Sequence, residues 1–230
     1  MAGMTRLPSD ARQAELVAAA LQLAAGRSPS TVTTADLAQA VGITQGAVFR
    51  HFPSKDAIWL AALDLVQTDL LERLHRAADA QSDPLAALRA IFIAHVDFVV
   101  EQPGVPRVIF QELQHPDDSP LKAQVRVLMQ TYRQLLAQWL RRALTAGRLA
   151  PGTDTQAAAV LFIGSVQGLV MQALISGQVG AMRRQAPAVF DLLLAGLAAP
   201  APVVPATELT CQPAPRRRPT RKTPTPETSA

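Results

Sequence analysis

The residues that could perform catalysis or bind a metal are scattered along the chain. Its histidines have no carboxylate at the H-E-x-x-H spacing of helical zinc sites; they are His51, His75, His95 and His115. Asp117 and Asp118 fall in a Pro-flanked loop, where solvated turn residues are typical. The sequence has no glycine-rich loop that would cradle a phosphate. We therefore expect no enzyme activity, no metal and no cofactor.

The segment 33–55, in contrast, gathers side chains of the kinds that contact DNA. Gln45 has an amide that can bond adenine, Gly46 allows close approach to a backbone, and Ala47 can touch a thymine methyl group. The hydroxyl, imidazole and cationic groups around them suit phosphate or base contacts. The candidate DNA-contacting residues are Thr33, Thr34, Thr44, Gln45, Gly46, Ala47, Phe49, Arg50, His51 and Lys55.

Local signals predict the helices that would position these residues. Apolar residues at three- and four-residue spacing predict a helix over 11–25. Thr33 and Asp36 have the spacing of a capping box, which predicts a second helix that ends near Ala40.

A turn and a third helix follow directly. Gly42 suits the left-handed backbone of a helix end, and Thr44 is a good N-cap for a helix over 45–51, which Pro53 ends. Two short helices braced by a preceding one predict a helix-turn-helix motif over 33–52. The last helix of such a motif fits the major groove of DNA.

The run from Thr33 to Asp56, TTADLAQAVGITQGAVFRHFPSKD, closely resembles the DNA-binding signature of the TetR/AcrR family of transcriptional regulators. The resemblance covers about residues 12–63. It implies an N-terminal DNA reader and a helical domain that binds a ligand and dimerises through its last two long helices. One position departs from the pattern: the family usually has Tyr where this chain has Phe49, which lacks the hydroxyl that commonly contacts a phosphate.

The rest of the chain predicts longer helices. Ala and Leu are abundant, aromatic residues make up 4%, and no strand-like alternation occurs, so we expect an all-α fold of about nine helices. We expect a DNA-binding domain over 1–55, a ligand-sensing and dimerisation domain over 56–199, and a tail over 200–230. The remaining helices are predicted near 54–79, 84–101, 105–114, 119–147, 154–177 and 186–198.

The tail, residues 200–230, contains eight prolines and has five basic and two acidic residues, so it holds most of the net charge of +4. We expect it to be disordered, because it cannot bury enough apolar surface to offset the entropy of ordering. Its basic cluster, 216–222, is either a solvated charge run or an arm that tethers the protein to DNA.

Cysteine usage and the first residues bear on the compartment. The single cysteine, Cys211, excludes an internal disulfide framework and fits a reducing environment. Residues 1–10 contain no apolar segment of the kind that signal peptides have. We therefore expect a cytoplasmic protein.

One predicted helix has no charged residue, and this allows two interpretations. Residues 157–175 are long and apolar enough to span a membrane. Glutamines in mid-span and the lack of an aromatic belt favour a soluble homodimer core instead, with Gly164 and Gly168 allowing close helix approach. We expect no membrane association. The candidate dimer contacts are Phe162, Gly164, Gly168, Met171, Leu193 and Leu197.

The helix predicted from residue 84 places His95 on its apolar face, between Phe92 and Val99. His95 is either a core histidine satisfied by a neighbour or the polar anchor of an apolar small-molecule site. The family resemblance implies such a pocket in this domain, although each candidate also fits an ordinary core. The candidate ligand-binding residues are Trp59, Phe92, His95, Phe110, Tyr132, Trp139 and Gln167.

These observations predict a homodimeric repressor that binds palindromic double-stranded DNA. A small effector, apolar or aromatic, is expected to release it from its operator. The alternatives are a helical enzyme, for which no catalytic motif is present, and a membrane-associated scaffold that uses the 157–175 helix and the basic tail, which solubility as a dimer without detergent would exclude. The residues identify neither the operator, nor the regulated genes, nor the effector.

Overall fold

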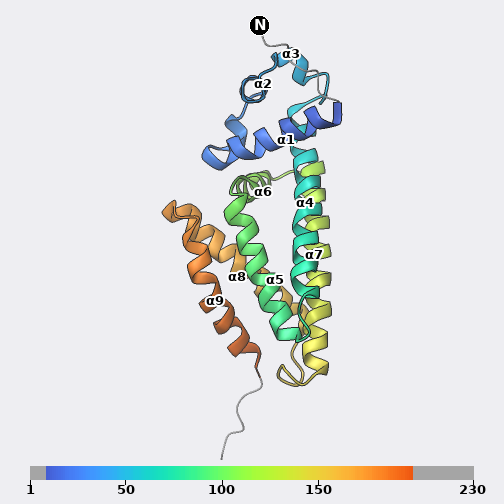
Figure 1. The fold of residues 1–230 in the computed structure, drawn as a ribbon, viewed down its shortest axis with the longest axis vertical. Coiled ribbons are helices and arrows are strands. Elements are labelled where there is room, and N and C mark those ends of the chain that lie inside the picture. The colour runs from blue at the N-terminus through green and yellow to red at the C-terminus, as the bar shows by residue number, and fades with distance from the viewer. Residues whose placement is uncertain (1–8, 199–230) are drawn as a thin grey trace, which may run out of the picture. The chain divides into compact units, whose positions relative to one another are not determined.

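A computed structural model describes residues 9–198, and this part of the chain consists of helices and loops without a strand (Figure 1). The all-α prediction with nine α-helices is confirmed for these residues. Residues 200–230, for which we predicted disorder, lie outside the described range. The elements are α1 (Ser9–Gly26), the short 3-10 helix η1 (Pro29–Thr31), α2 (Thr34–Ala40), α3 (Gln45–Val48), α4 (Lys55–Asp79), α5 (Pro84–Glu101), α6 (Gly104–Gln114), α7 (Pro120–Thr145), α8 (Thr155–Ser176) and α9 (Ala181–Leu197).

The predicted caps form at the helix-turn-helix. The backbone N–H of Asp36 donates to the Thr33 hydroxyl at 3.1 Å, and the Asp36 carboxylate accepts from the Thr33 N–H at 2.8 Å. The Thr33 hydroxyl also donates to the Asp36 carboxylate at 2.7 Å, and this bond, followed by the one from the Thr33 N–H and by the Arg27 guanidinium, lowers the pKa of Asp36 to about 2. Gly42 has a φ of 69°, and the Thr44 hydroxyl accepts from the N–H of Ala47. The sequence therefore starts α2 and α3 by local bonds alone.

Two helix boundaries differ from the prediction. α3 ends at Val48, and the next residues continue as a tighter turn in which the N–H of His51 donates to the Val48 carbonyl at 2.9 Å. α9 starts at Ala181 instead of 186 and contains Pro187 in its first half. The helix begins earlier because Met182 is buried against the core.

The C-terminal helices share one aromatic core around α5. Phe92 on α5 lies with its ring centroid 5.2 Å from that of Phe162 on α8 and 5.5 Å from that of Phe190 on α9. Tyr132 on α7 completes the cluster, 6.5 Å from Phe162. Such edge-on contacts are favourable beyond the area they bury. Phe162 therefore packs inside its own subunit, although we had expected it between subunits.

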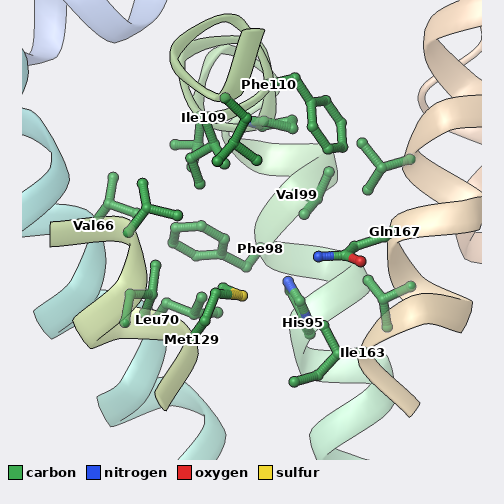
Figure 2. A pocket seen from close by; sticks show the side chains of 17 residues that line it. Val66, Leu70, His95, Phe98, Val99, Ile109, Phe110, Met129, Ile163 and Gln167 are labelled. Carbon is green, nitrogen blue, oxygen red and sulfur yellow. The ribbon is translucent and has the colours of Figure 1, made fainter. Parts of the chain in front are cut away.

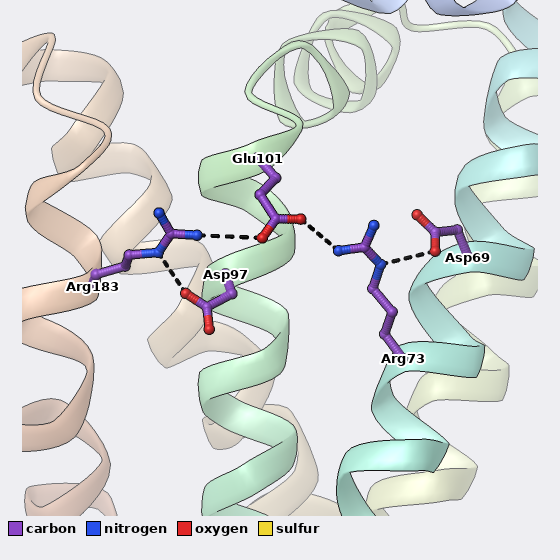
Figure 3. Close-up of polar contacts among 5 residues, drawn as sticks. All are labelled: Asp69, Arg73, Asp97, Glu101 and Arg183. Atoms are coloured by element: carbon purple, nitrogen blue, oxygen red, sulfur yellow. Dashed lines mark hydrogen bonds and ion pairs between the residues drawn. The ribbon is translucent and has the colours of Figure 1, made fainter.

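A chain of ion pairs joins α4, α5 and α9 at the C-terminal end of α5 (Figure 3). Arg73 binds Asp69 at 2.8 Å and Glu101 at 2.6 Å, and Arg183 binds Asp97 at 2.6 Å and Glu101 at 3.4 Å. The side chains are about half exposed, so each pair contributes modestly to stability. Because Glu101 serves both arginines, the network fixes the positions of three helices together.

The first residue of α6 lies against the backbone of α1. A Cβ atom added at Gly104 would overlap the carbonyl oxygen of Leu21 and lie 3.1 Å from the backbone nitrogen of Ala25. Only glycine allows two helices to approach this closely. In Figure 1, α6 lies on the side of α1 opposite to α2 and α3.

Candidate functional site

The predicted DNA-contacting residues form one surface on α2, α3 and the turn after α3. Thr33, Thr44, Gln45, Gly46, Phe49 and Arg50 are exposed, and Thr34, Ala47, His51 and Lys55 are partly exposed. Leu37, Ala38, Val48 and Phe52 are buried beneath them and form the core that holds the two helices. The Phe49 side chain is 50% exposed, which is unusual for an aromatic ring that only packs.

Hydrogen bonds already orient two of these side chains. The Gln45 amide donates to the Thr34 hydroxyl at 2.8 Å, which joins α3 to the first turn of α2 and leaves the amide oxygen free to accept. His51 lies against α1, where its Nδ1 is 3.4 Å from the Ser9 hydroxyl. The Arg50 side chain is exposed and makes no hydrogen bond or ion pair to another residue of 9–198.

Lys55 has a structural contact that the sequence did not reveal. Its amine donates to the carbonyl oxygens of Ser30 at 3.1 Å and Val32 at 3.2 Å. An ammonium group has three donors, so one remains for a phosphate. Lys55 thus ties the first turn of α4 to the segment that precedes α2.

An apolar pocket of about 100 Å³ lies among α4, α5, α6, α7 and α8 (Figure 2). His95 and Gln167 are its polar lining residues, and no lining residue is charged. The predicted residues His95, Phe110 and Gln167 line it. The other lining residues are Val66, Leu70, Phe98, Val99, Val105, Pro106, Ile109, Leu113, Val125, Leu128, Met129, Ile163, Val166 and Val170.

Four other candidate ligand residues lie outside this lining. Phe92 belongs to the aromatic core, and Tyr132 lies behind His95, to whose Nδ1 it is hydrogen-bonded at 3.0 Å. Trp59 lines a separate hollow with Lys55 and Gln111. Trp139 is buried, with the Arg142 guanidinium 4.5 Å from its ring centroid. The sequence identified these four residues as candidates and all four are buried, but it did not show which part of each helix lines the pocket.

The environment of His95 keeps its ring neutral. His95 and Tyr132 are buried, and their rings lie edge-on with centroids 5.2 Å apart. Burial lowers the pKa of His95 to about 4 and raises the pKa of Tyr132, because both charged forms lose their hydration. At neutral pH the pair is therefore an uncharged hydrogen-bonding unit beside the pocket.

His95 should make the protein less stable in mild acid. An unfolded histidine titrates near 6.5, and the folded one near 4. Between these values the unfolded state binds a proton that the folded state does not, so the free energy of unfolding falls as the pH drops from about 6.5 to 4. Above 6.5 the group has no effect. The expected loss is about 3 kcal/mol, since a tenfold change in proton affinity corresponds to ~1.4 kcal/mol.

Urea unfolding at several pH values between 7.5 and 4 measures this loss. The variant His95→Phe should be less sensitive to acid than the unmodified protein, whereas His115→Phe, at an exposed position, should behave like it. Asp36 does not interfere, because its contribution is present above about 3.8 and is lost only as the pH falls through about 2. Equal acid sensitivity of His95→Phe and the unmodified protein would contradict the buried neutral histidine.

α6 contacts the pocket and the N-terminal helices at the same time. One face contributes Val105, Ile109 and Phe110 to the pocket lining. The opposite face of α6 is hydrogen-bonded to η1 and the residue before it. The Gln111 side-chain oxygen accepts from the Ser28 hydroxyl at 2.9 Å and from the Ser30 N–H at 2.8 Å. A shift of α6 would therefore also move the segment that contains Ser30 and Val32, whose carbonyl oxygens accept hydrogen bonds from Lys55.

An apolar face on α8 and α9 remains exposed. Gly164, Gly168 and Met171, which we expected at a dimer interface, lie on exposed positions of α8, whereas Leu193 is buried and Leu197 is partly exposed. Other large apolar side chains share this face: Val160, Leu161, Ile175 and Leu192, each more than half exposed. We name these seven exposed residues (Val160, Leu161, Gly164, Gly168, Met171, Ile175 and Leu192) the α8–α9 face.

Residues 9–198 also bear on two other kinds of site, a metal site and a membrane-spanning helix. No group of three or more His, Cys, Asp or Glu side chains is placed to hold a metal ion in this part of the chain. One helix of this range, α8, is long and apolar enough to cross a membrane. Its Phe162, Val166 and Val170 side chains are nevertheless buried within the fold, as in the core helix of a soluble protein.

Sequence comparisons match both parts of the helical region. Residues 16–62 match the bacterial regulatory proteins of the tetR family, and residues 84–189 match the tetracyclin repressor-like C-terminal domain. The nucleoid occlusion factor SlmA of Vibrio vulnificus (strain YJ016) is 31% identical over 169 residues, which cover 73% of this chain and 85% of the relative. SlmA of Vibrio cholerae is 29% identical over the same length and coverage.

Solved structures share the fold at low identity. The fatty acid degradation regulator FadR of Bacillus halodurans superimposes with a TM-score of 0.74 and 17% identity, covering 86% of this chain and all of that one. FadR of Bacillus subtilis in complex with stearoyl-CoA has a TM-score of 0.71 and 17% identity, with coverages of 80% and 98%. NalD, the secondary repressor of the MexAB-OprM multidrug efflux pump of Pseudomonas aeruginosa, has a TM-score of 0.62 and 23% identity, with coverages of 83% and 97%.

Proposed function

The chain belongs to the TetR family, whose members are DNA-binding, ligand-responsive repressors. We propose that it is a cytoplasmic homodimer that binds a palindromic operator, and that a small uncharged effector releases it from this DNA. The observation that carries this proposal is the capped α2–α3 unit. It presents Gln45 and Arg50 to solvent above a buried core of Leu37 and Val48. An exposed first turn with a glutamine amide and an arginine nearby is the chemistry of base and phosphate contacts.

The α8–α9 face supports the homodimer. A monomer rarely leaves a contiguous group of large aliphatic side chains in water. In the proposed dimer, the glycines at 164 and 168 allow α8 to approach the partner closely, and two copies of α3 enter successive major grooves about 34–36 Å apart. A palindromic operator follows from the twofold symmetry of such a dimer.

Release by an effector is proposed to run through α6. A ligand in the apolar pocket contacts Ile109 and Phe110, and Gly104 and Gln111 on the same helix contact α1 and η1. The ligand favours the arrangement of α6 that accommodates it, so the spacing of the two readers and the affinity for DNA change together. The relatives' names differ in biological role, from nucleoid occlusion to regulation of fatty acid degradation, so no effector is carried over.

Arg50→Ala tests the reading surface. The loss of one cationic contact in each subunit should weaken binding to an inverted-repeat DNA fragment selected with the protein by about tenfold to a hundredfold, with the dimer intact. A gel-shift titration measures the affinity, and size-exclusion chromatography with light scattering measures the dimer. Arg133→Ala, an exposed arginine on α7, is the matched control and should bind normally. Unchanged affinity of Arg50→Ala would contradict this placement of the reading surface.

A further inference from the structure

We infer that the pocket selects uncharged ligands with a hydrogen-bond acceptor, which the Nε2–H group of His95 binds, and that Tyr132 fixes the proton on that nitrogen. This inference rests on the proposed function only in taking the pocket for the effector site. It names the chemistry of the effector, which neither the family match nor the relatives supply.

The lining contains no group that could compensate a charge on a ligand. Apart from His95 and Gln167 it is wholly apolar, and no Asp, Glu, Lys or Arg contributes to it. A carboxylate or an ammonium ion would lose its hydration on entry without gaining an ionic partner, which opposes binding. The neutral state of the His95 ring removes the one group that could have become a cation.

The hydrogen bond between Tyr132 and His95 determines which ring nitrogen carries the proton. The Tyr132 side chain is fully buried, and within residues 9–198 its hydroxyl has the Nδ1 of His95 as its hydrogen-bond partner, at 3.0 Å. If Nδ1 carried the proton, the tyrosine hydrogen would have no acceptor, and a buried unpaired donor is costly. The hydroxyl therefore donates to Nδ1, and a neutral imidazole then carries its proton on Nε2.

The Nε2–H group is left for a ligand. It makes no hydrogen bond to a residue of 9–198, and the small exposed part of His95 belongs to the pocket lining. Figure 2 shows the His95 ring and the Gln167 amide directed toward the same part of the cavity. Gln167 lines the pocket from an exposed position of α8, so its amide is accessible to solvent as well as to a ligand. A hydrogen-bond donor at the wall of an apolar cavity favours ligands that have an acceptor over ligands that have none. A carbonyl oxygen is the simplest such acceptor.

The size of the cavity limits the probes. A dry apolar cavity of about 150 Å³ accommodates benzene, and this pocket is smaller, at about 100 Å³, so the probes must be small single-ring molecules. Acetophenone, cumene and benzoate are such molecules and have the same number of non-hydrogen atoms. They differ in one group: a carbonyl that accepts a hydrogen bond, an isopropyl that does not, and a carboxylate that is charged.

Calorimetric titration of the full-length protein at pH 7.5 with each probe tests the inference. Acetophenone should bind at least tenfold more tightly than cumene, and benzoate at least tenfold more weakly than cumene. In His95→Phe the preference for acetophenone over cumene should fall to within twofold while cumene still binds. Met129→Leu, on the apolar wall, is the matched control and should keep the preference.

Tyr132→Phe keeps the test decisive if His95→Phe does not fold. It retains the imidazole but removes the hydroxyl that fixes its proton, so the preference should fall several-fold. Benzoate binding as tightly as acetophenone, no binding of any probe, or an unchanged preference in the variants would overturn the inference.

A gel shift with the selected DNA fragment separates this inference from the proposed function. Selective binding of acetophenone without any effect on DNA affinity would leave the selectivity standing and remove the pocket's effector role. Release from DNA by benzoate but not by acetophenone would overturn the selectivity and leave the repressor function standing.

Discussion

Replacing Leu161 with glutamate should leave the protein monomeric and lower its affinity for inverted-repeat DNA at least a hundredfold. Leu161 is 52% exposed on the α8–α9 face, about one helical turn before Gly164. A carboxylate there costs little in the monomer because water reaches it. In the proposed dimer it would be desolvated against an apolar surface without a partner, which costs several kcal/mol per ion. A monomer has one reading surface and loses the gain from binding two half-sites at once.

Leu65→Glu is the matched control for this substitution. Leu65 lies on α4, is 51% exposed and is not part of the α8–α9 face, so the same change there should leave both the dimer and DNA binding intact. Sedimentation velocity at micromolar concentration measures the oligomeric state of both variants. A dimeric Leu161→Glu protein would show that the subunits meet through another surface.

Replacing Gly104 with alanine should destabilise the protein by about 3 kcal/mol, the upper part of the range for overpacked sites. The new methyl group would overlap the Leu21 carbonyl oxygen and lie 3.0 Å from the carbonyl carbon, and backbone atoms of a helix cannot move aside cheaply. α6 must then separate from α1, which also loosens the contact that joins the pocket to the DNA reader. Thermal unfolding measures the stability, and gel shifts with and without an effector measure the coupling.

Gly26→Ala provides the comparison for Gly104→Ala. Gly26 ends α1, and a Cβ added there would meet nothing within 4 Å. Its replacement should be neutral or slightly stabilising, because alanine is the better helix former. If Gly104→Ala were as stable as Gly26→Ala, the contact between α6 and α1 would not be as close as described.

Local chemistry made the DNA-reading unit predictable. The Thr33–Asp36 capping box, the Gly42 turn and the Thr44 cap are each set by a few neighbouring residues, and all three form as expected. The contacts of Lys55 were not predictable, because Ser30 and Val32 meet its amine only when α1, η1 and α4 are packed. Side-chain bonds between distant segments leave no periodic trace in a sequence.

The pocket and the dimer surface show the limits of periodicity. An evenly apolar helix such as α8 has no preferred face, so Phe162 was expected between subunits although its neighbours on α5 and α9 bury it. Tyr132 and Trp139, which we expected to bind the ligand, are buried on α7, but only the packing of five helices decides that the pocket is lined by Leu128 instead. Periodicity identifies which side chains point inward, whereas cavities depend on where the helices cross.

The bonds from Lys55 have a consequence for how control operates. They join the start of α4 to the segment that leads into α2, so a tilt of α4 would carry the helix-turn-helix with it. An effector would then act on joint occupancy of the two operator arms and not on recognition of either arm by itself. Control of this kind would require no unfolding and would leave the base preferences of the protein unchanged.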